Sequence, residues 1–186
     1  MAALTGKKIV FLTANEGVEQ VELTEPWQAI QDAGGQPVLL APEAGSVQAF
    51  NHLDKADTFD VDKTVGTASA QDYDGLVLPG GVANPDNLRT HSEAVDFIKE
   101  FVAAGKPVAA VCHAPWTLIE AGVLVGKSLT SWPSLQTDIR NAGGNWRDDE
   151  VITSSENGWT LVTSRNPGDL PAFGKTAVSV FAGEAS

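Results

Sequence analysis

Short apolar runs alternate with segments of helical periodicity along most of the chain. Apolar residues recur at helical spacing in three long segments, over 21–33, 94–105 and 168–182. We expect Pro26 to limit the start of the first helix to about its own turn, because proline lacks the N–H that a helix interior needs. The runs between these segments are the pattern of strands buried on both faces of a parallel sheet; they lie at 7–13, 36–41, 75–79 and 108–111.

Shorter elements fill the rest of the chain. Residues 47–50 and 58–61 are expected to pair as a hairpin, and Asn157-Gly158 favours a second one between strands at 150–153 and 160–164. A brief strand at 127–131 and a helix at 135–142 complete the pattern. Strands alternate with helices without a repeat or a linker. We therefore predict one α/β domain over residues 1–186, a three-layer α/β/α sandwich with a flavodoxin-like, mostly parallel sheet and a C-terminal β-hairpin.

Charge and cysteine content narrow the possible partners. The net charge is −12 and the basic residues are scattered, so we expect no nucleic-acid partner. One cysteine and three dispersed histidines form no recognisable metal site, and we expect no cofactor. The tract over 108–125 is broken by polar residues and residues 1–8 lack an apolar signal region, which favours a cytoplasmic protein without a membrane span.

The single cysteine, Cys112, stands with His113 between the buried run at 108–111 and a short helical segment at 117–121. A side chain at that junction sits on a sharp turn at the carboxyl end of a strand, which is the geometry of a nucleophile elbow. The helix N-terminus beyond it favours thiolate over thiol. An inert buried thiol is the alternative, but the position at a strand end favours a reactive one.

Candidate partners for the sulfur follow two other strands. Gly80-Gly81 comes directly after the run at 75–79, and the N–H groups of Gly81 and His113 are expected to form an oxyanion hole. Glu16, Glu19 and Glu22 follow the first strand. Most of these acids are expected to be solvated, and one is expected to meet the sulfur with a raised pKa.

Other polar residues give weaker signals. By itself, Asp86 in Asn84-Pro-Asp86 is an ordinary turn residue. His52 and His91 are assigned to the surface. Trp116, one turn after the cysteine, is expected to wall the pocket.

The chain resembles the PfpI-type intracellular peptidase family, which lies in the glutamine amidotransferase-like superfamily together with the parkinsonism-associated deglycase. The resemblance runs over almost the full length. Its motifs are Ile9–Glu16, Glu19–Leu23, Leu76–Gly81, Gly105–His113, Asn141–Gly144 and Thr163–Pro171.

The resemblance implies roles for four residues. Cys112 would be the nucleophile, Glu19 the buried acid that hydrogen-bonds its sulfur, and His113 a group that assists proton transfer. Asp86 matches an acid that orients this imidazole from a neighbouring subunit, so a homo-oligomer, from dimer to hexamer, is implied. The loop before Glu19 is one residue longer than in the family pattern, which leaves Glu16 as a rival for the acid.

Three functions stay open on this basis. The first is a stress-response enzyme with glyoxalase or deglycase-like chemistry, in which Cys112 attacks an α-oxoaldehyde or its protein adducts without a cofactor. The second is an intracellular cysteine peptidase. The third is a non-enzymatic redox sensor in which Cys112 is oxidised. Ala114-Pro-Trp116 replaces the Gly-Pro-Gln of many family members, so the sequence leaves the substrate open.

Overall fold

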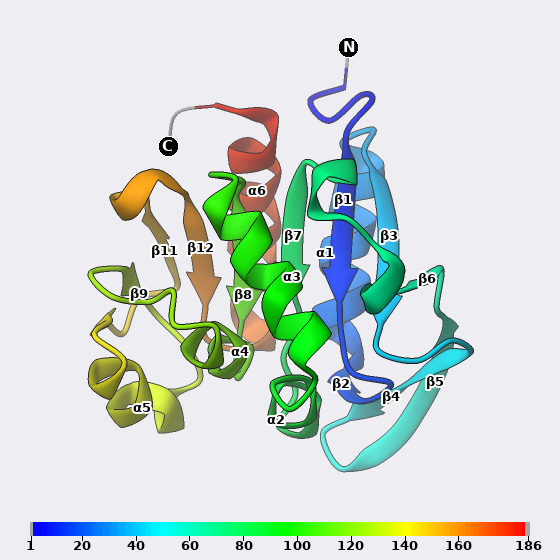
Figure 1. Cartoon of the computed structure of the whole chain (residues 1–186), viewed down its shortest axis with the longest axis horizontal. Helices are drawn as coiled ribbons and strands as arrows, with labels where there is room; N and C mark the ends of the chain where they lie inside the picture. The colour runs from blue at the N-terminus through cyan, green and yellow to red at the C-terminus, as the bar shows by residue number, and fades with distance from the viewer. Residues whose placement is uncertain (1, 185–186) are drawn as a thin grey trace.

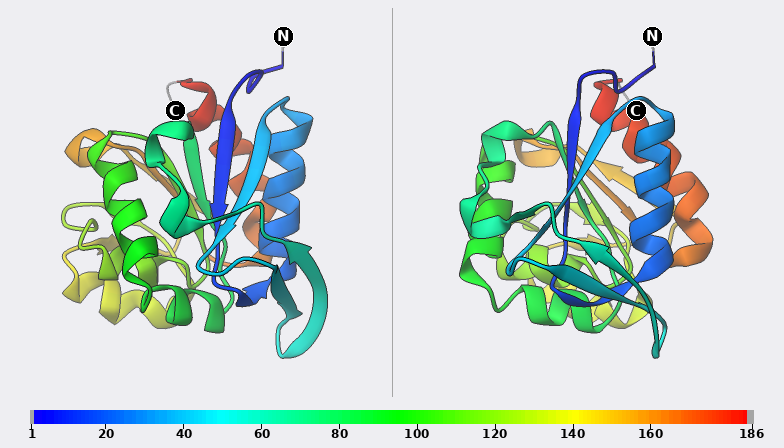
Figure 2. Two further views of the ribbon diagram at one scale, coloured as in Figure 1. Left: turned by 45° about the vertical axis from the view of Figure 1, so that its right-hand side comes forward. Right: turned by 90° about the vertical axis from the view of Figure 1, so that its right-hand side faces the viewer.

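The computed structural model describes residues 2–184 and places a seven-stranded sheet between two layers of helices (Figures 1 and 2). Its strand order is β11-β12-β8-β7-β1-β3-β6, and β11 is the one strand in it that runs antiparallel to its neighbour. The predicted three-layer sandwich with a mostly parallel sheet is thereby confirmed. The strands are β1 (Lys8–Leu12), β3 (Gln36–Ala41), β6 (Lys63–Thr64), β7 (Gly75–Leu78), β8 (Val108–Val111), β11 (Val151–Ser154) and β12 (Leu161–Ser164).

Helices cover both faces of this sheet. The long helices α1 (Gln20–Asp32) and α6 (Leu170–Ala182) pack side by side on one face, and α3 (Ser92–Ala103) lies on the other (Figure 2). Shorter helices surround the lower end of the sheet in Figure 1: α2 (Ala83–Leu88), α4 (Pro115–Glu120) and α5 (Gln136–Asn141). Two small sheets lie beside the main one: β2 (Glu16–Glu19), β4 (Ser46–Asn51) and β5 (Asp54–Asp60) form one, and β9 (Ser128–Leu129) and β10 (Asn145–Trp146) form the other.

The alternation of side chains along the strands divides the core in two. In β1, Ile9 and Phe11 pack into the layer that holds α1 and α6, whereas Val10 and Leu12 pack toward α3. All four are fully buried. A parallel strand covered by helices on both faces needs apolar residues at every position, which is why these strands read as unbroken apolar runs.

Both hairpins form as predicted. Strands β4 and β5 pair with Val47 opposite Phe59, and β11 pairs with β12 across the turn that contains Asn157 and Gly158. Asn157 and Gly158 both have positive φ angles, which this dipeptide tolerates well. The second hairpin adds β11 to the edge of the main sheet.

The segment after β1 differs from the prediction. Part of the expected loop forms the strand β2, and the helix begins at Gln20, so Pro26 lies inside it. Pro26 cannot donate a backbone hydrogen bond to Glu22 there. The buried face of the helix, which includes Leu23, Pro26 and Ile30, compensates for that loss because tertiary packing supplies most of a helix's stability in a protein.

The carboxyl ends of β1, β7, β8 and β12 point to the same edge of the sheet, the lower edge in Figure 1. Strand β2, helices α2 and α4 and the β4–β5 hairpin gather at this edge (Figure 1). Ligands of open α/β sheets bind at such an edge. Over residues 2–184, no helix has the length and apolar character needed to cross a membrane.

Candidate active site

Cys112 occupies a strained backbone position at the end of β8. Its φ angle is +63°, in the left-handed region that costs a side-chain-bearing residue about 1–2 kcal/mol. Two backbone hydrogen bonds hold it there: its N–H donates to the carbonyl of Ser164 (3.1 Å), and its carbonyl accepts from the N–H of Trp132 (2.9 Å). The predicted nucleophile elbow is present, with the thiol nearly buried at 6% exposure.

His113 places its imidazole beside the sulfur. Nδ1 lies 3.1 Å from Sγ of Cys112. The ring stacks on Trp132 and tilts against Trp116, with centroids 5.6 and 5.2 Å away. Burial between these rings disfavours the charged imidazolium and lowers the pKa of His113 to about 4. The imidazole is therefore neutral at neutral pH.

The acid beside the sulfur is Glu22, and the assignment of that position to Glu19 is wrong. Glu22 lies in the first turn of α1, fully buried, and its carboxyl lies close enough to the Cys112 side chain for the two groups to shift each other's pKa. Its Oε2 also accepts the N–H of Gly80 at 2.9 Å. Glu19 precedes the helix as its N-cap residue and accepts the N–H of His52 at 3.0 Å. Glu16, the rival candidate, is exposed at the start of β2.

The pKa values of Glu22 and Cys112 depend on each other. Burial raises the pKa of Glu22 to about 7, and burial together with the charge of Glu22 raises the pKa of the Cys112 thiol. The N–H groups of Gly81 and His113 act in the opposite direction on the thiol but do not outweigh burial. The two groups therefore titrate as a coupled pair. When the pair has lost one of its two protons, the remaining proton is on either the carboxyl or the thiol. The expectation that the helix N-terminus would lower the thiol pKa is wrong because it left out burial.

The packing around Glu22 and Cys112 requires glycine at both position 80 and position 81. A Cβ atom on Gly80 would lie 2.5 Å from Oε2 of Glu22 and 2.7 Å from Cβ of Cys112. Gly81 has a φ angle of +83°, and a Cβ there would lie 2.3 Å from the carbonyl oxygen of Gly17. With glycine at both positions, the N–H of Gly81 lies close enough to the sulfur to favour the thiolate, as the N–H of His113 does.

Asn84 fixes the loop that carries these glycines, and the sequence reasoning missed it. Its buried amide donates to the carbonyls of Pro79 (2.9 Å) and Gly80 (3.0 Å) and accepts the N–H of Ala14 (2.7 Å). It thus joins the ends of β1 and β7. The Asn-Pro dipeptide indicated only a turn, and nothing in the local pattern indicated that the amide is buried.

A cavity of about 500 Å³ opens above the sulfur. Glu16, Glu19 and Glu22 all line it, together with Cys112, His113 and Gly81, so the predicted convergence of the three segments is confirmed. His52, assigned to the surface, also lines it, from the turn of the β4–β5 hairpin. Phe50 and Trp132 are aromatic residues of the cavity lining, whereas Trp116 contacts His113 from outside it.

Asp86 stands apart from this group. It lies on α2, is exposed, and pairs with Arg89 at 2.7 Å, while Arg89 in turn lies over the Trp116 ring at 5.1 Å. It does not line the cavity. Its proposed action on His113 from a neighbouring subunit stays a prediction. Among residues 2–184, no group of three or more His, Cys, Asp or Glu side chains is arranged to hold a metal ion.

A comparison with known protein families matches residues 7–180 to the DJ-1/PfpI family. The chain belongs to this family. It is 38% identical to the Putative cysteine protease YraA of Bacillus subtilis over 174 residues, which cover 94% of this chain and 98% of the relative. It is 37% identical to Protein/nucleic acid deglycase 2 of Escherichia coli over 172 residues, 92% of this chain and 96% of the relative. General stress protein 18 of Bacillus subtilis is 36% identical over 94% of this chain and 98% of its own length.

Solved structures of the same family share the fold. A two-domain protein of Anabaena variabilis, with DJ-1/ThiJ/PfpI-like and ferritin-like domains, aligns with a TM-score of 0.85 and 34% identity. The alignment covers 96% of this chain and 48% of that protein, so the chain spans about half of its length. DJ-1beta of Drosophila melanogaster aligns with a TM-score of 0.83 and 27% identity, covering 96% and 91% of the two chains.

Proposed function

We propose that the chain is a cofactor-independent cysteine hydrolase that acts on α-oxoaldehydes or on the adducts they leave on amines and thiols. The observation that carries this proposal is the pair of Cys112 and Glu22, a nucleophile on a strained elbow with a buried acid whose pKa is about 7. An acid with that pKa both donates and accepts a proton at neutral pH. The deglycase and stress-protein names of the relatives agree with this chemistry.

The first step is addition of the Cys112 sulfur to the aldehyde carbon. A carbon–sulfur bond forms, the carbonyl electron pair moves to oxygen, and that oxygen takes the proton held by the pair, giving a hemithioacetal. The N–H groups of Gly81 and His113 lie next to the sulfur and stabilise the negative charge that develops on the oxygen.

The second step moves a proton between neighbouring carbons. Glu22, now a carboxylate, removes the proton from the former aldehyde carbon and returns it to the former ketone carbon, while the hydroxyl proton passes from the oxygen on the first carbon to the oxygen on the second. The first carbon is thereby oxidised to a thioester and the second is reduced to an alcohol, so no external oxidant or reductant is needed. Water then cleaves the carbon–sulfur bond and releases a 2-hydroxy acid and the thiol.

An adduct on an amine or a thiol requires one further bond to break. The carbon that bears the amine carries a hydroxyl group and is in equilibrium with the free aldehyde. Attack of Cys112 on that aldehyde draws the equilibrium toward release of the amine. The same residues thus serve the free oxoaldehyde and its adduct.

A cysteine peptidase is the second candidate, because one relative carries the name of a putative cysteine protease. A peptidase needs an imidazolium that protonates the leaving amine. The pKa of about 4 keeps His113 neutral, and within residues 2–184 of one chain no carboxylate hydrogen-bonds its ring. This activity would require Asp86 from a second subunit of a homo-oligomer. Burial of Cys112 weighs against a redox sensor, which needs an accessible thiolate.

Release of lactate from methylglyoxal tests the proposal. Purified protein should produce lactate at pH 7, Cys112→Ala should produce none above the buffer rate, and Glu22→Gln should lose about a hundredfold or more. Glu16→Gln is the matched control, since it removes an exposed cavity carboxylate that does not contact the sulfur, and it should retain most of the activity. Lactate release that survives Cys112→Ala would refute the proposal. Peptide cleavage abolished by Asp86→Asn would favour the peptidase.

A further inference from the structure

The cavity above Cys112 has an apolar rim that the chemistry proposed above does not use. Its members are Leu53 at the turn between β4 and β5, Val82 directly after Gly81, and Trp132 after β9. They are 94, 58 and 40% exposed. Among residues 2–184, four large apolar side chains are exposed to this degree, and three of the four line this one cavity. Apolar exposure concentrated around one hollow is typical of a binding site.

The rim is held in place by contacts with the site. The turn that carries Leu53 is tied down by the hydrogen bond from the N–H of His52 to Glu19. The ring of Trp132 stacks on the His113 ring, and the backbone N–H of Trp132 donates to the carbonyl of Cys112. Val82 follows the glycine whose N–H reaches the sulfur. An apolar group bound against the rim would therefore have a fixed position relative to the nucleophile.

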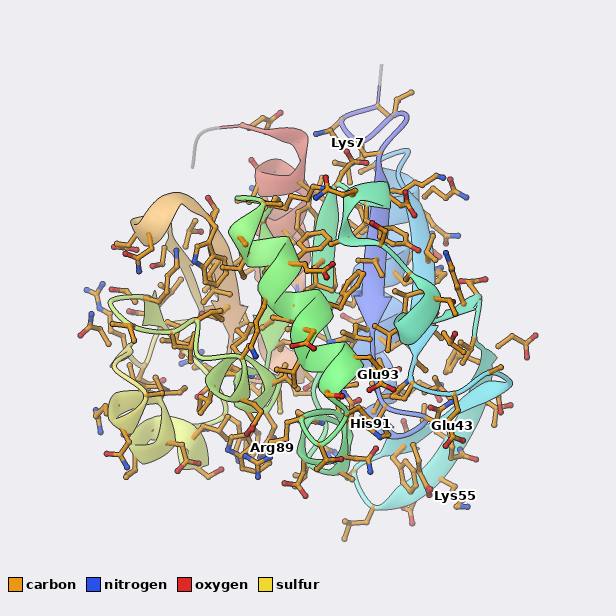
Figure 3. All side chains as sticks on the ribbon, in the orientation of Figure 1. Lys7, Glu43, Lys55, Arg89, His91 and Glu93 are labelled. Carbon is orange, nitrogen blue, oxygen red and sulfur yellow. The ribbon has the colours of Figure 1, made fainter. Side chains whose placement is uncertain are left out.

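The charges around the cavity select against anions. Its lining includes Glu16, Glu19 and Glu22, and no lysine or arginine of residues 2–184 belongs to it. Lys55 and Arg89 lie at this end of the molecule (Figure 3), but neither lines the cavity, and Arg89 is paired with Asp86. A substrate that carries its own carboxylate would be repelled by these acids.

The volume of the cavity indicates the size of the substrate group that the rim would bind. A cavity of about 500 Å³ lies within the range of about 300–1,000 Å³ in which proteins hold ligands much larger than a three-carbon oxoaldehyde. Methylglyoxal on Cys112 would leave the rim in contact with water. A phenyl-sized group next to the attacked carbonyl would cover it.

We propose that the substrate of this site is an oxoaldehyde, free or as an adduct, that bears an uncharged apolar group of about phenyl size, and that Leu53, Val82 and Trp132 bind this group. This inference rests on the proposed function for the reacting part of the substrate. It goes further by assigning the class of the part that does not react.

Steady-state kinetics of the whole protein test the specificity. The value of kcat/KM should be about tenfold or more higher for phenylglyoxal, which yields mandelate, than for methylglyoxal, and it should be lower for 4-carboxyphenylglyoxal, which keeps the oxoaldehyde but adds a carboxylate, than for phenylglyoxal. Leu53→Ser and Val82→Ser should each lower the phenylglyoxal-to-methylglyoxal ratio several-fold. Val125→Ser is the matched control, because Val125 is 65% exposed and lies outside this cavity, and the ratio should not change.

A binding measurement separates this inference from the proposed function. Acetophenone lacks the aldehyde, so its binding to the Cys112→Ala protein, followed by calorimetry, reports the rim alone. If Leu53→Ser weakens acetophenone binding and no oxoaldehyde is turned over, the binding role of the rim is supported and the proposed function is refuted. Turnover of methylglyoxal and phenylglyoxal with equal kcat/KM would refute the rim and support the function. Leu53→Ser could instead change the sedimentation mass and leave the phenylglyoxal-to-methylglyoxal ratio of kcat/KM unchanged. That result would show that a second copy of the chain covers the rim, and it would overturn the inference.

Discussion

The carboxyl group of Glu22, from the first turn of α1, meets the sulfur of Cys112 at the end of β8. Both groups are acids and both are buried: the negative charge of Glu22 raises the pKa of the Cys112 thiol, whereas contact with the Cys112 side chain lowers the pKa of Glu22 by less than burial raises it. A thiolate can form here at modest cost only while Glu22 keeps its proton. The reactivity of the cysteine is thus governed by a residue that lies far away in the sequence.

Alkylation of Cys112 by iodoacetamide should depend on Glu22. The rate should keep rising through the alkaline range, because burial and the charge of Glu22 raise the pKa of the Cys112 thiol. In Glu22→Gln the charge that raises the thiol pKa is gone, so the midpoint should move to lower pH and alkylation at pH 8 should be several-fold faster. Glu16→Gln, the control, removes an exposed carboxylate of the same cavity and should shift the midpoint much less. An unchanged midpoint in Glu22→Gln would contradict the action of Glu22 on the thiol.

The free energy of unfolding should carry the signature of Glu22 between pH 4.5 and 7. Its pKa rises from 4.5 in the unfolded chain to about 7 in the folded one, so the folded state binds more protons in this window and stability falls as pH rises. The full effect is about 3 kcal/mol. In Glu22→Gln this loss is absent, so the variant should become more stable relative to the parent by that amount across the window.

The lowered pKa of His113 acts in the opposite direction between pH 4 and 6.5, because the unfolded state then binds more protons. This contribution of His113 is present in both the parent protein and Glu22→Gln, so it cancels in the difference between their free energies of unfolding. Urea unfolding of the two proteins at several pH values measures the effect. A difference that stays constant with pH would contradict the raised pKa of Glu22.

The backbone strain at Cys112 should be measurable by comparing two substitutions. Cys112→Ala and Cys112→Gly both remove the sulfur, but only glycine accepts a φ angle of +63° at little cost. Cys112→Gly should therefore be the more stable of the two by about 1 kcal/mol. Greater flexibility of glycine in the unfolded chain makes this difference a lower bound on the strain. An alanine variant that is clearly more stable than the glycine variant would mean that the elbow carries little strain.

Asn84 should behave as a positioning residue. Asn84→Ala leaves the N–H of Ala14 and the carbonyls of Pro79 and Gly80 without their partner, which should cost about 3 kcal/mol of stability. Because the Gly81 N–H is then no longer held at the sulfur, kcat should fall more than KM rises. Asn87→Ala, in the same helix but exposed, is the control and should change neither quantity. Loss of stability with an unchanged kcat would show that Asn84 has a structural role only.

Strand positions and the elbow could be read from the sequence because local pattern determines both. Four of the central strands are unbroken apolar runs, and Cys112 stands where one of these runs meets a helix. The acid could not be assigned in the same way. Glu19 and Glu22 are three residues apart, about one helical turn, so the point at which the helix begins decides which of them turns inward. The unforeseen strand β2 sets that point, since it makes Glu19 the N-cap of α1.

The remaining site residues depend on tertiary structure. His52 reaches the cavity because the β4–β5 hairpin folds back onto Glu19, and Trp132 reaches it because its N–H bonds to the elbow. Neither residue has a local pattern that marks it. The buried amide of Asn84 likewise became visible only when the ends of β1 and β7 were placed side by side.

The surroundings of the single thiol have a consequence for how folding can be followed. Glu22 and Gly81 act on the sulfur from two distant segments of the chain, and the backbone of Cys112 is bonded to two more, at Trp132 and Ser164. A partly assembled chain has an ordinary thiol, because none of these neighbours acts on it alone. With one cysteine in the sequence, a thiol-reactive dye would report the last stage of assembly without any added label.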